Sequence, residues 1–184
     1  DKLEALEPRI IAPAHGIVWR ENPERIVQLY RRHVGYALGK AEAAITVIWG
    51  SMYGMTERAV EAVVQGIREE EVPVHAFRVP QEHISHILAA AWRSSGVVVA
   101  APTYEYKMFP PMAAALDELG RKKVVRKKAF RFGSYGWSGG AQKELEEIIE
   151  RLRMNWEFAE PYEFAGAPTK QDLEELRERG RSFA

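Results

Sequence analysis

The chain has 184 residues, and its 26 Lys and Arg side chains are balanced by 26 Asp and Glu, so the formal net charge is zero. This balance argues against binding of the whole chain to nucleic acid or to an anionic membrane, and the absence of cysteine excludes disulfides, thiolate metal sites and iron–sulfur clusters. The charged start, residues 1–4, does not resemble a signal peptide, and no apolar run approaches the about 20 residues of a membrane span. We therefore expect a cytoplasmic protein, and the missing initiator Met suggests a fragment or an engineered boundary.

The first part of the chain predicts a short strand, a helix and a linker. Residues 10–16 have the apolar character of a strand that runs into a loop. Asn22 before Pro23 is typical of a helix start, because Asn caps the first N–H groups and proline suits the first helical position. The helical spacing of apolar residues ends near Gly39, which suits a C-cap, and residues 40–44 are expected to form a linker.

From residue 45 onward, short apolar strands alternate with amphipathic helices. Strands are expected over residues 45–49, 74–79, 97–101, 129–135 and 156–164, and helices over residues 56–71, 82–94, 108–120, 140–153 and 169–181. The third strand is apolar throughout, which is typical of a strand buried on both faces. Thr169 and Asp172 resemble a capping box at the start of the last helix. Regular alternation predicts an α/β fold with a doubly wound parallel sheet.

In such a sheet, ligands bind beyond the carboxyl ends of the strands, so the loops after the first, third and fourth strands are the candidates. Residues 50–56 combine glycines, hydroxyl groups and the N–H groups of a helix start, and this combination suits a phosphate. The alternative is a glycine turn in which Thr56 is the N-cap of the helix. Residues 102–110 and 134–141 carry aromatic side chains that suit the walls of a flat ligand, or else pack on their own loops. The P-loop lysine and the G-x-G-x-x-G fingerprint are absent. A phosphate site beside aromatic walls predicts FMN.

Three segments resemble the FMN loops of flavodoxin-like domains. They are Ser51-Met52-Tyr53-Gly54-Met55-Thr56-Glu57, Ala101-Pro102-Thr103-Tyr104 and Gly133-Ser134-Tyr135-Gly136-Trp137-Ser138-Gly139-Gly140-Ala141. The resemblance covers about residues 44–184 and implies a flavodoxin-like sheet of five parallel strands in the order 2-1-3-4-5. It assigns no catalytic residue. The cofactor-binding residues that it implies are Ser51, Met52, Tyr53, Gly54, Met55, Thr56, Pro102, Thr103, Tyr104, Glu105, Tyr106, Ser134, Tyr135, Gly136, Trp137, Gly139 and Gly140.

More narrowly, the chain resembles the C-terminal part of flavodiiron proteins, which join a metallo-β-lactamase-like diiron domain to a flavodoxin domain. Residues 12–19 look like the end of the diiron domain, where the last histidine ligand of the family matches His15. The resemblance therefore implies that residues 1–43 are a remnant of that domain with a linker, and that residues 44–184 bind FMN. His83 and His86 lie three residues apart, and a solvated helix face explains them more simply than a metal site does.

The resemblance implies that FMN in this chain passes electrons to the diiron domain of a full-length oxygen or nitric oxide reductase. The expected electron donor is rubredoxin or a rubredoxin reductase, and self-association is expected to be at most a weak homodimer. The chain alone lacks the other diiron ligands, so it is expected to be an electron-transfer module rather than a complete oxidoreductase. A stand-alone FMN-dependent NAD(P)H or quinone reductase is the alternative, and a non-flavin interaction domain with packed aromatic loops is a third.

Two basic runs, residues 121–123 and 126–128, lie between the helix expected over residues 108–120 and the strand expected over residues 129–135. They are either a solvated connection or a docking patch for an acidic redox partner.

Overall fold

The structure is a computed structural model that describes residues 7–184, so the charged start over residues 1–4 lies outside the described residues. The chain divides into two compact units, with the boundary between Lys40 and Ala41. In the first unit, the strand expected over residues 10–16 is wrong, since only Ile11 pairs there, in an isolated bridge with Trp19. Pro13 has no N–H to donate and Gly16 turns the chain at a φ of 112°, which prevents a continuous strand.

Helix α1 (Pro23–Ala37) begins as the sequence predicts. The Asn22 side chain accepts a hydrogen bond from the Arg25 N–H, and Gly39 leaves the helix with a φ of 98°. Positive φ suits glycine because it has no Cβ, so the predicted C-terminal signal is confirmed.

The second unit alternates strands and helices. Its elements are β1 (Glu42–Trp49), α2 (Met55–Glu69), β2 (Val74–Arg78), α3 (Ile84–Arg93), β3 (Ser94–Ala100), β4 (Thr103–Tyr104), β5 (Lys107–Met108), α4 (Pro110–Arg121), β6 (Lys128–Tyr135), α5 (Ala141–Arg151), β7 (Glu157–Phe158), β8 (Tyr162–Ala165) and α6 (Lys170–Phe183). β1 begins inside the linker expected over residues 40–44, which is therefore shorter than predicted. The capping box of Thr169 and Asp172 is confirmed at the start of α6.

The sheet has the strand order β2-β1-β3-β6-β7, and β8 also pairs with β6. Every pairing within it is parallel, so the predicted flavodoxin-like order 2-1-3-4-5 is confirmed. The expected fifth strand is divided into two pieces, of which β7 pairs with the start of β6 and β8 with its end. Pro161 lies in the break, and proline cannot donate a hydrogen bond to a sheet ladder.

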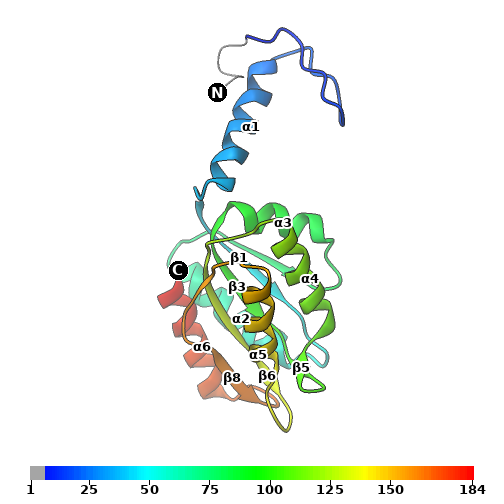
Figure 1. The fold of residues 1–184 in the computed structure, drawn as a ribbon. Helices are drawn as coiled ribbons and strands as arrows, with labels where there is room; N and C mark the ends of the chain where they lie inside the picture. Colours follow the sequence, from blue (N-terminus) through cyan, green and yellow to red (C-terminus); the bar gives the residue numbers. More distant parts are fainter. Residues whose placement is uncertain (1–6) are drawn as a thin grey trace. The chain divides into compact units, whose positions relative to one another are not determined.

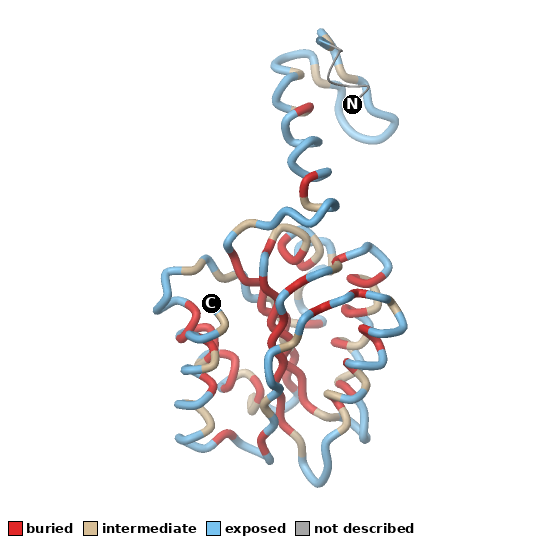
Figure 2. Tube along the Cα trace, turned by 60° about the vertical axis from the view of Figure 1, so that its left-hand side comes forward, coloured by how far each residue is buried: buried red, intermediate tan, exposed pale blue. Residues whose placement is uncertain are grey.

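Helices cover both faces of the sheet (Figure 1). Residues of α2 and α6 pack with one face in one apolar cluster, and residues of α3, α4 and α5 pack with the other face in a second cluster. Figure 2 shows the buried residues of this unit concentrated along the central strands. Val97, Val98 and Val99 are all buried, which confirms that β3 is covered on both sides. No helix within residues 7–184 is long and apolar enough to cross a membrane.

One residue of the two basic runs, Lys127, is not solvated, in contrast to the solvated connection considered for these runs. Lys127 is buried, and its Nζ donates hydrogen bonds to the carbonyls of Trp92 at 3.0 Å and Ser94 at 2.6 Å. These carbonyls lie at the carboxyl end of α3, where unpaired carbonyls favour a positive charge. The remaining five basic residues of the two runs are exposed. Burial lowers the pKa of Lys127 to about 8.

We predict that Lys127 makes stability depend on pH in the alkaline range. The unfolded chain keeps the proton up to the ordinary pKa of 10.5, whereas the folded chain releases it near 8, so raising the pH between these values stabilises the fold. Urea unfolding should show wild type gaining stability relative to Lys127→Met between pH 8 and pH 10. The exposed neighbour supplies the control, Lys128→Met, which removes one charge without removing a buried amine; an equal pH trend in both variants would contradict the prediction.

Candidate functional site

The ends of β1, β3 and β6 bring the three predicted loops to one edge of the sheet. Trp49 is paired with Ala100, and Ala100 with Phe132, so the three strands end nearly level. The ladder continues into the loops, since the Gly50 N–H donates to the Ala100 carbonyl at 2.9 Å and the Ala101 N–H donates to the Phe132 carbonyl at 3.2 Å. This is the edge where ligands of doubly wound sheets bind.

The first loop, residues 50–54, turns directly into α2. The Ser51 hydroxyl accepts a hydrogen bond from the Gly54 N–H at 3.0 Å, and Gly54 turns the chain with a φ of 84°. Gly54 is the N-cap residue and no side chain caps the helix start, so the alternative of Thr56 as N-cap is wrong. An uncapped helix start offers free N–H groups and a positive dipole end to an anion.

Thr56 connects the first loop to the third. Its side chain is only 1% exposed, and its hydroxyl lies 3.3 Å from the hydroxyl of Ser134, which is also buried. The two loops are 78 residues apart in sequence, so this contact could not be predicted from local spacing.

The second loop forms a hairpin of β4 and β5 that the sequence did not predict. Its two turn residues, Glu105 and Tyr106, have positive φ values of 46° and 64°. The Thr103 hydroxyl accepts a hydrogen bond from the Ala141 N–H at 3.3 Å, and a Cβ added at Gly140 would lie 2.0 Å from the Tyr106 carbonyl oxygen. The hairpin therefore rests directly on the start of α5, and only glycine fits at position 140.

The three loops enclose a cavity of about 490 Å³, which lies in the range of small-molecule sites. Its lining residues are Met52, Tyr53, Met55, Pro102, Thr103, Glu105, Tyr106, Ser134, Tyr135, Gly136, Trp137, Ser138 and Gly166. Ser138 lies inside the third predicted loop but was not among the predicted cofactor residues, and Gly166 lies outside all three predicted loops. Gly166 follows β8 with a φ of 64°, and a glycine just after a predicted strand was the available signal.

Six of the predicted cofactor residues are not in the lining of this cavity. They are Ser51, Gly54, Thr56, Tyr104, Gly139 and Gly140. Ser51 shapes the first loop through its bond with Gly54, whereas Thr56 and Gly140 hold different loops together through the contacts described above. Tyr104 lines a neighbouring cavity with Pro110. Gly139 lies against β8, since a Cβ added there would be 3.3 Å from the Glu163 carboxylate. Burial raises the pKa of Glu163, and the nearby Arg131 opposes that shift.

Exposed aromatic rings surround the cavity. Tyr53 is 83% exposed, Tyr106 is 75% exposed and Trp137 is fully exposed. Large exposed rings gathered at a concave site indicate a ligand or partner that covers them. Flat walls and an uncapped helix start together fit a planar ring system that carries a phosphate, which is the chemistry of FMN.

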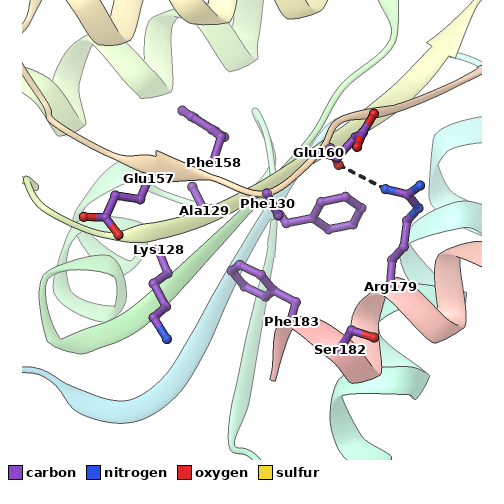
Figure 3. Close-up of a pocket in the computed structure, with 10 residues that line it drawn as sticks. Lys128, Ala129, Phe130, Glu157, Phe158, Glu160, Arg179, Ser182 and Phe183 are labelled. Atoms are coloured by element: carbon purple, nitrogen blue, oxygen red, sulfur yellow. Dashed lines mark hydrogen bonds between the residues drawn. The ribbon is translucent and has the colours of Figure 1, made fainter.

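A second cavity of about 400 Å³ lies between α6 and the strands β6 and β7 (Figure 3). The rings of Phe130 and Phe183 face each other there, and the Arg179 guanidinium donates to the Glu160 carbonyl at 3.2 Å. None of the three predicted loops contributes to this cavity, and no helix start opens onto it among its lining residues. It does not share the features that fit FMN.

The histidines considered as metal ligands are not among the residues that line the cavity. His15 is exposed in the first unit, within the turn between Ile11 and Trp19. His83 caps α3 by accepting from the Ser85 N–H, and His86 pairs with Glu82. Within residues 7–184, no group of three or more His, Asp or Glu side chains is arranged to hold a metal ion.

Comparison with known proteins agrees with this geometry. The family model for flavodoxin matches residues 47–180. The anaerobic nitric oxide reductase flavorubredoxin of Vibrio vulnificus is 36% identical over 178 residues, which are 95% of this chain and 35% of that protein. The chain thus spans about a third of the length of the curated relatives it matches.

Solved structures show the same relationship. Rubredoxin oxygen:oxidoreductase from Desulfovibrio gigas superposes with a TM-score of 0.85 at 26% identity, over 96% of this chain and 43% of that one. A flavodoxin from the domain Archaea superposes with a TM-score of 0.68 at 27% identity, over 76% of this chain and 95% of that one.

We predict that Thr56→Val weakens FMN binding by about 1–3 kcal/mol, because it removes a hydroxyl that either bonds the phosphate or positions Ser134. Titrations with FMN and with riboflavin, which lacks the phosphate, separate the two roles. A loss confined to FMN indicates a phosphate contact, whereas an equal loss for both indicates positioning through Ser134. Unchanged affinity for both ligands would contradict the prediction, and Thr56→Ser is the control that keeps the hydroxyl.

Proposed function

This chain belongs to the flavodoxin family, whose members hold FMN beyond the carboxyl ends of their central strands, and we propose that it is the electron-transfer module of a longer oxidoreductase of the flavodiiron type. FMN, the cofactor predicted from the sequence, is the cofactor of flavodoxin domains. One observation carries the proposal: three loops far apart in sequence line a single cavity with exposed aromatic rings, at the point between β1 and β3 where the strand order reverses.

The residues of the three loops have different roles in FMN binding. When bound, FMN supplies the electron chemistry, and the protein orients it and tunes its potential. The first loop and the start of α2 would receive the phosphate, because free N–H groups and the helix dipole favour an anion there. The rings of Tyr53, Tyr106 and Trp137 would flank the flavin and exclude water from it. Thr56 and Ser134 would keep the phosphate and ring loops in register.

The names of the relatives extend the proposal to the longer protein. One relative is a rubredoxin oxygen:oxidoreductase and another is an anaerobic nitric oxide reductase flavorubredoxin. We infer that rubredoxin or a rubredoxin reductase donates electrons to this chain, and that a diiron domain receives them and passes them to oxygen or nitric oxide. Residues 1–43 would be the end of that domain, with His15 as one of its metal ligands. A cytoplasmic location belongs to the same proposal and is checked by cell fractionation.

We predict that the FMN-loaded chain accepts electrons rapidly from reduced rubredoxin and only slowly from NADH or NADPH. Hydride transfer requires the nicotinamide to lie on the flavin at about 3–3.5 Å, whereas electron transfer from rubredoxin requires no stacked substrate. Stopped-flow mixing that follows the loss of flavin absorbance measures both rates on the same sample. Rapid and saturable bleaching by NADH, with rubredoxin inert, would support the stand-alone reductase and remove the proposed relay.

We predict that the purified chain self-associates only weakly. Among the described residues of the second unit, the exposed large apolar side chains all lie in the cofactor loops, and they are Met52, Tyr53, Tyr104, Tyr106 and Trp137. Once FMN covers part of this surface, the second unit has little apolar area left for a stable dimer, which buries about 1,600 Å² in total. Self-association of the chain would then rest on the exposed apolar side chains of the first unit, which are Ile10, Ile17, Val18, Leu29, Tyr30, Val34 and Leu38. Light scattering at micromolar concentration should report a monomer, and a tight dimer would contradict the prediction.

A further inference from the structure

The turn of the β4–β5 hairpin has an unusual backbone at the wall of the candidate flavin cavity. Glu105 and Tyr106 both have positive φ and both line the cavity. Two successive residues with positive φ are typical of a two-residue hairpin turn that favours Asn, Asp or Gly. Since neither residue is one of these, the surroundings must hold the turn in place.

The first turn of α5 holds both strands of the hairpin. The Thr103 hydroxyl of β4 accepts from the Ala141 N–H at 3.3 Å, and the Met108 N–H of β5 donates to Glu144 Oε2 at 2.6 Å. Between these two contacts, the Tyr106 carbonyl packs against Gly140. The turn is therefore fixed at three points along one helix start.

Glu144 makes the shortest of these contacts, and it lies in the first turn of α5. Its side chain is 21% exposed, and a carboxylate in the first turn of a helix is stabilised by the helix dipole. A hydrogen bond from a backbone N–H to a carboxylate is stronger than one between neutral groups. The ion pair of Glu144 with Lys107 is longer, at 3.8 Å, and Lys107 is largely exposed, so it contributes little.

We propose that Glu144 is a positioning residue for the flavin site. By accepting the Met108 N–H, it fixes the Glu105–Tyr106 turn against the cavity and so sets both the affinity for FMN and the reduction potential of the bound flavin. Glu144 does not line the flavin cavity, so it acts through the hairpin. The inference rests on the proposed function, because it takes FMN as the ligand.

The reduction potential of the bound flavin is sensitive to the Glu105–Tyr106 turn, because this turn brings backbone dipoles and the exposed Tyr106 ring to the cavity wall. Hydrogen-bonding groups and water access near a flavin tune its electronics. If the Met108 N–H loses its acceptor, β5 loses its hydrogen bond to α5, and the hairpin keeps only the Thr103 hydrogen bond and the packing of Tyr106 on Gly140, so the turn is freer to relax away from its positive φ values.

Three variants test the proposal. Glu144→Ala removes the acceptor, Glu144→Gln keeps an acceptor oxygen without the charge, and Lys107→Met removes only the ion pair. We expect Glu144→Ala to weaken FMN binding about tenfold or more and to shift the midpoint potential, with Glu144→Gln intermediate, because its acceptor oxygen is neutral, and Lys107→Met close to wild type. Amide exchange of Met108 in the FMN-free protein should speed up in Glu144→Ala alone.

The outcomes separate this inference from the proposed function. If wild type binds FMN and Glu144→Ala matches it in affinity and potential, the positioning role is wrong while the proposed function stands. If Glu144→Gln loses as much as Glu144→Ala, an acceptor oxygen at this position contributes nothing to the site, which also overturns the role. If wild type fails to bind FMN, both proposals fall. Should Glu144→Ala not fold, Glu144→Met preserves the length of the side chain without an oxygen and is expected to show the same losses.

Discussion

The parallel pairing of β1, β3 and β6 is the constraint on which the candidate site depends. Each of these strands enters the ladder from the same end, so each following loop leaves at the same edge, and the pairing of Trp49, Ala100 and Phe132 makes the three exits nearly level. The two faces of these strands pack in two different apolar clusters, so a slip by one residue, which would exchange the faces of every side chain, would disrupt both clusters. The loops thus meet although 78 residues separate Thr56 in the first from Ser134 in the third.

Glycines then let the loops approach more closely than other residues allow. A Cβ at Gly133 would lie 1.8 Å from the Ala101 carbonyl oxygen, and one at Gly140 would lie 2.0 Å from the Tyr106 carbonyl oxygen. These two contacts join the end of β6 to the loop after β3, and the start of α5 to the hairpin. Any side chain at either position would push the second and third loops apart and widen the cavity between them.

Elements set by local pattern could be predicted from the sequence, and elements set by long-range contact could not. The apolar run of β3, the cap at Asn22 and the capping box at Thr169 each follow from neighbouring residues, and all three are confirmed. The β4–β5 hairpin was missed because its turn residues are Glu and Tyr, which carry no turn signal, and its stability comes from α5. Lys127 was missed for a similar reason, since its partners at the end of α3 lie more than 30 residues earlier.

The candidate site combines a rigid frame with aromatic side chains whose packing contributes little to the stability of the fold. The frame is the buried ladder and the glycine contacts, whereas Tyr53, Tyr106 and Trp137 leave most of their ring area in water. Exposed rings of this size contribute little to folding, because apolar area stabilises a protein only when it is removed from water. The free energy gained by removing these rings from water is therefore available to a ligand or protein that covers them. Under the proposed function, a flat cofactor would cover the inner surfaces of such rings and leave their outer surfaces for a protein that brings electrons, so the same three side chains would connect FMN binding to partner contact.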